Sequence, residues 1–147
     1  MELKHQDLFV ELDIIDLYPP DNLNPVETVA YRWVSTPIEN EVNFLPNYLF
    51  DKLKNNVERY SNGRYSKEDL VKRCSQSFFN NLHSAKVNHK KIPKGMRDKL
   101  GYTHIAEGEM NKEDGFATET NAIGHFGFYE CYLCDLKLKF KICDSLN

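Results

Sequence analysis

The final stretch of the chain carries the pattern that most restricts the fold. In residues 135–142, four apolar side chains alternate with three basic ones: Leu136, Leu138, Phe140 and Ile142 against Lys137, Lys139 and Lys141. Successive side chains of an extended strand point to opposite faces of a sheet, so this alternation predicts a half-buried antiparallel strand. Lysines on the open face are typical of an edge strand that resists pairing with other molecules.

Other segments indicate a mixture of helices and strands. Residues 26–35 are rich in β-branched and aromatic side chains, and residues 124–134 alternate aromatic ones, with Gly127 as a candidate bulge, so both predict strands. Residues 46–60 repeat leucine and valine every four positions, which predicts a helix. Residues 86–99 are expected to form a basic connection. The predicted class is α+β, an antiparallel C-terminal sheet packed against one to three helices.

Two segments leave alternatives open. Residues 8–17 are apolar with acidic interruptions and fit a strand or a short helix. Ser66 begins a helix signature, because its hydroxyl can accept from the backbone near Asp69. That helix either continues to Leu82 or breaks near Cys74, leaving 75–79 as a short strand. The pattern alone does not separate these two structures.

The composition indicates one globular domain over residues 1–147. A chain of 147 residues with 41% hydrophobic side chains can bury a core without disulfides or metals. No run approaches the ~18 apolar residues of a membrane span, and the first residues lack a signal-peptide pattern. Four unevenly spaced cysteines do not form a secreted framework, so we expect a reducing compartment, the cytoplasm, and no membrane partner.

Charge is distributed unevenly along the chain. Residues 1–58 hold 11 acidic and 4 basic side chains, residues 59–104 hold 3 acidic and 11 basic, and residues 105–147 hold 8 acidic and 4 basic. A basic middle segment between acidic flanks points to partners rather than to fold. We therefore predict a non-catalytic interaction domain that binds an acidic partner through residues 59–104.

The predicted partner-binding residues are seven cations of that segment: Arg73, Lys86, Lys90, Lys91, Lys94, Arg97 and Lys99. An acidic protein surface, including self-association with the acidic flanks, is the expected partner. Nucleic acid is the less favoured alternative, because the pI of about 5.9 is low for such a binder. The hypothesis requires that the cations converge on one exposed patch once the chain folds.

An enzyme that uses a nucleotide is the rival hypothesis. Arg32 lies on a predicted strand, Ser77 belongs to Ser75-Gln76-Ser77, and Glu130 ends Phe128-Tyr129-Glu130. In this order the three patches resemble the arginine, serine and glutamate strands of ADP-ribosyltransferases. The resemblance implies that Arg32 contacts NAD, Ser77 orders the pocket and Glu130 binds a ribose hydroxyl. If residues 66–82 form one helix, Ser77 falls outside this pattern.

Two further groups are weaker candidates for chemistry. His104 lies near Glu107 and Glu109, and a histidine beside a carboxylate can transfer protons at neutral pH. Cys131 and Cys134 have the spacing of half a zinc site, but no second pair of ligands completes it. We therefore expect no metal and no cofactor on these grounds, and buried structural cysteines instead.

Overall fold

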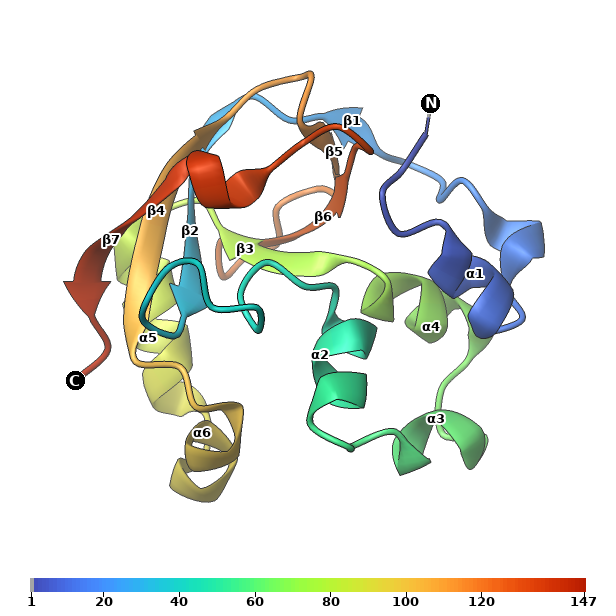
Figure 1. The fold of residues 1–147 in the computed structure, drawn as a ribbon, viewed down its shortest axis with the longest axis horizontal. Helices are drawn as coiled ribbons and strands as arrows, with labels where there is room; N and C mark the ends of the chain where they lie inside the picture. The colour runs from blue at the N-terminus through green and yellow to red at the C-terminus, as the bar shows by residue number, and fades with distance from the viewer. Residues whose placement is uncertain (1) are drawn as a thin grey trace.

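A computed structural model describes residues 2–147 (Figure 1). Its strands are β1 (Asn24–Pro25), β2 (Thr28–Val34), β3 (Gln76–Phe79), β4 (His104–Met110), β5 (Gly115–Ala117), β6 (His125–Glu130) and β7 (Phe140–Ser145). Its α-helices are α1 (Asp7–Glu11), α2 (Asn47–Leu53), α3 (Glu58–Ser61), α4 (Lys67–Arg73), α5 (Leu82–Lys91) and α6 (Lys94–Leu100). Two 3₁₀ turns, η1 (Ile15–Leu17) and η2 (Leu136–Leu138), complete the described elements.

All seven described strands join one antiparallel sheet in the order β1-β5-β6-β3-β2-β4-β7. The α+β class is therefore confirmed. The sheet is larger than expected, because β1 and β2 come from the first quarter of the chain rather than from its C-terminal part. Six described α-helices accompany it, instead of the one to three that the sequence predicted.

The centre of the sheet is held by aromatic packing. Phe78 on β3 is fully buried, and its ring lies 5.6 Å from Phe128 and 5.5 Å from Phe140, both also buried. On the opposite face, the indole of Trp33 donates from Nε1 to the backbone oxygen of Ala85 at 2.8 Å, which fastens α5 to β2. The sheet therefore has side chains packed on both faces, as a central sheet of an α+β domain requires.

The helices form two groups below the sheet in Figure 1. Helices α5 and α6 lie at the lower left, while α2, α3 and α4 lie at the lower right, with α1 beyond them. A separate cluster of buried side chains joins α1 to this right-hand group and includes Leu8, Phe9, Ile14, Tyr48 and Cys74. Residues far apart in the sequence, 47–73 and 82–100, thus flank the same region under β2 and β3.

The strand predicted from the alternating pattern of residues 135–142 is only partly confirmed. Residues 136–138 form η2, and the side chain of Asp135 caps its start by accepting from the amide of Lys137. Leu136 is buried at 1% exposure, but Leu138 is 84% exposed, because a 3₁₀ turn does not keep both on one face. Only β7 is extended, and it is an edge strand as expected.

Four other predictions were resolved by the structure. The segment 66–82 breaks after α4, so Ser77 lies on strand β3, and Ser66 and Asp69 form a reciprocal capping box. The predicted connection 86–99 is wrong, since it forms most of α5 and α6, with Pro93 between them. The predicted helix 46–60 is divided into α2 and the start of α3. The pairing Ser77 with Gly127 is regular, so Gly127 marks no bulge.

The first apolar segment resolves to α1 and η1 rather than to a strand. Within residues 2–147, no helix combines the length and the apolar character needed to cross a membrane.

Candidate functional site

The two helix groups and the sheet enclose a cleft, here called the aromatic cleft, with a volume of about 420 Å³. Its floor is formed by β2, β3 and β6, through Arg32, Ser77 and His125. Its walls come from α2, α3 and α4 on one side and from α5 and α6 on the other. A cavity of this size is in the range that holds small molecules.

Arg32 occupies the floor where β2 and β3 separate. These strands share a single aligned pair, Tyr31 with Phe79, and beyond it the Arg32 guanidinium bridges the gap. Its Nη1 donates to the Ser77 carbonyl at 2.8 Å and its Nη2 to the Leu45 carbonyl at 3.0 Å. The guanidinium also lies 5.2 Å from the centre of the Phe78 ring. These contacts fix its orientation without neutralising its charge.

The charge of Arg32 has no carboxylate partner among residues 2–147. None of the ion pairs there includes it, and its Nε is buried without a hydrogen-bond partner. Only 4% of the residue is exposed. Burial lowers the pKa of Arg32, but a guanidinium remains charged in proteins. The negative charge of Glu130 partly opposes this effect, but it forms no ion pair with Arg32. A buried cation without an ion-pair partner is costly unless an anion approaches it.

Two more arginines reach the wall of the cleft and share one acid. The Oδ2 atom of Asp51 on α2 accepts from Arg59 at 2.6 Å and from Arg73 at 2.7 Å. The Tyr60 hydroxyl donates to the same oxygen, and Arg73 Nε donates to Tyr60 at 3.0 Å. Three guanidinium groups and one carboxylate therefore line the cleft, which leaves an excess of positive charge in it.

The remaining wall is aromatic. Phe50 and Tyr102 stack with ring centres 5.4 Å apart, and Trp33 lies 6.3 Å from Tyr102 and 5.3 Å from Phe79. These four rings all line the cleft. Flat apolar rings beside fixed cations can hold a ligand that combines a planar ring system with negative charge.

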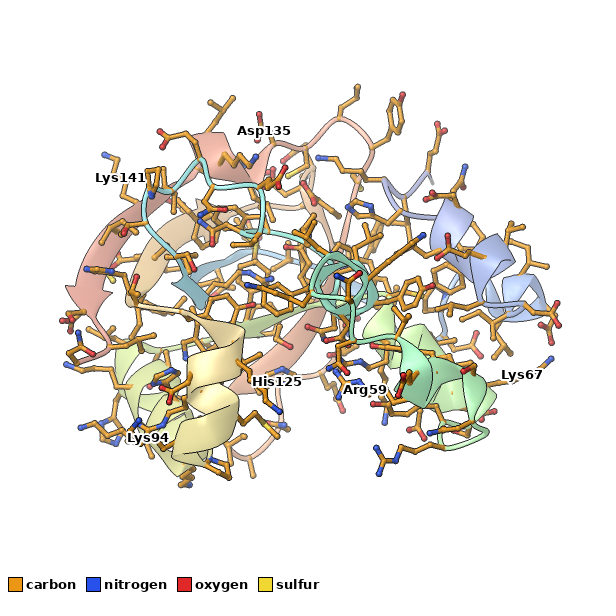
Figure 2. The ribbon with its side chains drawn as sticks, turned by 60° about the horizontal axis from the view of Figure 1, so that its bottom comes forward. Arg59, Lys67, Lys94, His125, Asp135 and Lys141 are labelled. Atoms are coloured by element: carbon orange, nitrogen blue, oxygen red, sulfur yellow. The ribbon has the colours of Figure 1, made fainter. Side chains whose placement is uncertain are left out.

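His125 stands at the start of β6, on the floor of the cleft. Figure 2 shows it between α6 and Arg59, which come from the two helix groups. Its ring packs edge-on against Phe79 at 5.5 Å. Burial, together with the positive charge of Arg32, holds the pKa of His125 below its ordinary value of 6.5. The imidazole is therefore neutral at pH 7 and able to accept a proton or a hydrogen bond.

The residues of the enzyme hypothesis are only partly brought together. Arg32 and Ser77 both line the aromatic cleft, but Glu130 does not. Strand β6 directs His125, Gly127 and Tyr129 toward the cleft side, whereas Glu130 points to the other face, since alternate residues face opposite ways. There Glu130 is 5% exposed and binds Lys4 at 2.7 Å and Gln76 at 2.8 Å.

His104 also lies away from the cleft. It begins β4, pairs with Val34 and Ser145 across the sheet, and contacts the Thr103 hydroxyl at 2.8 Å. The four cysteines are free thiols, and no cluster of three metal-ligating side chains occurs within residues 2–147. Cys134 is buried, with its sulfur 3.6 Å from Asp114 Oδ1.

The cations of the middle segment divide into two groups rather than one patch. Figure 2 shows Lys67 and Lys94 at opposite ends of the molecule. Of the predicted partner-binding residues, Arg73 pairs with Asp51, Lys86 with Asp144 and Lys94 with Asp98. The other four predicted residues take part in no ion pair within the described chain and lie on α5 and α6: Lys90, Lys91, Arg97 and Lys99.

Sequence reasoning missed several residues that build the cleft. Trp33 and Asp51 were not identified, although Trp33 is the one tryptophan of the chain and directly follows Arg32. His125 was not among the predicted site residues either. Asp51 carried no signal, because its partners Arg59 and Arg73 are 8 and 22 positions away in the sequence.

Comparisons with protein-family models, with curated proteins and with solved structures gave no match to this chain.

The hydrogen bond between Tyr60 and Asp51 predicts how the stability of the folded chain changes at alkaline pH. Burial, reinforced by the hydrogen bond to Asp51, raises the pKa of Tyr60 from 10.0 to about 12. An unfolded chain releases this proton near pH 10.0 while the folded chain keeps it, so stability falls as pH rises from 10.0 to about 12. Urea denaturation across this range should show a shallower fall for Tyr60→Phe than for the natural chain. Tyr132→Phe, at a 59% exposed position, is the control and should leave the slope unchanged. Equal slopes for Tyr60→Phe and the natural chain would contradict the prediction.

Proposed function

We propose that this protein binds a nucleotide-type ligand in the aromatic cleft. The observation that carries the proposal is Arg32, a buried guanidinium on the cleft floor that forms no ion pair with any carboxylate of the described chain. An anionic group is the natural complement of such a cation, and phosphate matches the planar donor geometry of arginine. Arg59 and Arg73, which share Asp51, supply further donors on the wall.

The aromatic lining supports a base attached to the phosphate. Trp33, Phe50, Phe79 and Tyr102 offer ring faces and edges against which a nucleobase can pack, as aromatic side chains do in nucleotide and single-strand sites. Asn88 adds an amide oxygen that can accept at the base edge, while its nitrogen already donates to the backbone oxygens of Ser84 and Ile123. A free inorganic anion would leave these rings without a contact, which favours a ligand with both parts.

The resemblance to ADP-ribosyltransferases supports the same ligand class, because it implies an NAD-type dinucleotide. Arg32 and Ser77 are the two matching residues that line the cleft. Glu130 is committed to Lys4 and Gln76 on the other face, so the resemblance offers no carboxylate for a ribose hydroxyl. We therefore limit the proposal to nucleotide binding and attach no transfer step to Glu130.

A fluorescence titration tests the proposal, since the single tryptophan of the chain lies in the cleft. ADP should change the emission of Trp33 along a saturating curve. Arg59→Gln removes one charged donor while Asp51 keeps Arg73 and Tyr60, so ADP should bind about tenfold more weakly. Arg32→Lys should weaken ADP by a similar or larger factor, provided that circular dichroism shows a folded chain.

Lys91→Gln is the matched control, because Lys91 ends α5 outside the cleft lining. Its affinity for ADP should stay within about twofold of the natural chain. No saturable change in Trp33 emission at millimolar ADP would refute nucleotide binding. An equal loss in Lys91→Gln and Arg59→Gln would refute binding in the cleft.

A second candidate function is docking of an acidic protein partner on α5 and α6. The specific observation is that Lys90, Lys91, Arg97 and Lys99 lie on these adjacent helices without an ion pair in the described chain. Residues 82–100 carry six basic side chains and one acidic side chain. Such a charged face raises association rates and is screened by salt. The proposed surface is thus the α5–α6 face rather than the whole of residues 59–104.

Labelled polyglutamate is a direct probe of this second function. Its affinity should fall as salt rises, and reversal of Lys90, Lys91 and Lys94 to Glu should abolish binding. Reversal of Lys112, Lys137 and Lys141 changes the net charge equally at positions outside α5 and α6, and it should retain most of the binding. Binding that is insensitive to ionic strength, or lost equally in both triple variants, would rule out the α5–α6 surface.

A further inference from the structure

A second cavity adjoins the aromatic cleft and is unused by the proposed function. This polar chamber has a volume of about 540 Å³ and lies over β3 and β6 toward α4. It shares four lining residues with the aromatic cleft: Asn47, Arg73, Ser77 and His125. The two cavities therefore meet along these side chains, and a ligand longer than a nucleotide could enter both.

The chamber differs from the cleft in chemistry. Hydroxyl, amide, carboxylate and ammonium groups line it, including those of Ser75, Thr118, Asn121, Glu119 and Lys72. Four of its polar groups make no side-chain hydrogen bond or ion pair within residues 2–147, namely those of Tyr65, Lys72, Glu119 and His125. This chamber offers donors and acceptors to a ligand.

Glu119 and Lys72 are the most informative of these groups. They carry opposite charges and line the same cavity, yet they do not pair with each other. Glu119 belongs to the loop between β5 and β6, and Lys72 belongs to α4. A ligand with several hydroxyl groups could fill the space between them, donating to the carboxylate and accepting from the ammonium.

These groups point to a sugar. A carboxylate that accepts from a ribose hydroxyl is a recurrent way for proteins to bind nucleotides, and a tyrosine ring such as that of Tyr65 can pack against the apolar face of a sugar. Arg73 lines both cavities, so a diphosphate bound near it would have its base on one side and its sugar on the other.

We infer that the ligand is a nucleoside diphosphate sugar, whose base and diphosphate occupy the aromatic cleft and whose terminal sugar occupies the polar chamber beside Glu119 and Lys72. This inference rests on the proposed nucleotide function and extends it to a ligand class. Glu119 thus takes the part of a sugar-binding carboxylate that the sequence had given to Glu130.

Calorimetry with two matched ligand pairs tests the inference: ADP against ADP-ribose, and UDP against UDP-glucose. For the base that the cleft prefers, the sugar-bearing ligand should bind at least about tenfold more tightly than the bare diphosphate. Glu119→Gln and Lys72→Gln should each remove most of this gain and leave the diphosphate affinity within about twofold. Both residues are exposed, so the variants should fold.

Glu113→Gln is the control, because Glu113 is an exposed acid outside both cavities. It should change neither affinity. Equal affinity for ADP and ADP-ribose and for UDP and UDP-glucose would overturn the sugar inference while leaving nucleotide binding intact. A gain that survives in both Glu119→Gln and Lys72→Gln would overturn the assignment of the chamber. If neither diphosphate nor either sugar-bearing ligand binds, the proposed function itself fails.

Discussion

The structure depends on a cation placed where two central strands part. Strands β2 and β3 are neighbours in the sheet but share only one aligned residue pair, so their remaining edge must be satisfied in another way. Arg32 does this by donating to the Ser77 carbonyl of β3 and to the Leu45 carbonyl before α2. The same guanidinium closes the sheet, positions the chain leading to α2 and gives the aromatic cleft its charged floor.

Charge compensation explains how the rest of the site tolerates its arginines. Asp51 forms ion pairs with both Arg59 and Arg73, and this attraction offsets part of the free-energy penalty of partly burying the two arginines. Arg32 receives carbonyl dipoles, the face of Phe78 and the more distant negative charge of Glu130, but it forms no ion pair. The positive charges that line the cleft are thus only partly neutralised by Asp51. This excess of positive charge favours the binding of an anionic ligand. His125, neutral at pH 7, adds no competing charge.

Patterns among neighbouring residues correctly predicted those secondary-structure elements that depend mainly on local sequence. The β-branched and aromatic run around Arg32 marked β2, and the Ser66 to Asp69 spacing marked the start of α4. The position of Glu130 could not be predicted in this way, because it depends on which face of β6 meets the cleft. That face is fixed by the pairing of Ser77 with Gly127, 50 positions apart in the chain. The division of the basic segment into two groups could not be predicted either, because Lys86 and Lys67 form ion pairs with acids that are distant in the sequence, Asp144 and Asp16.

The most direct measurement is an NMR titration of the arginine side-chain Nε–H signals with ADP. The Arg32 signal is assigned by its loss in Arg32→Lys. If the guanidinium of Arg32, which has no ion-pair partner, draws the ligand into the cleft, this signal shifts along a saturating curve, together with the Nε1–H signal of Trp33. An Arg32 signal that stays fixed while amides of α5 and α6 shift would contradict the account and would locate anion binding on the outer helices instead.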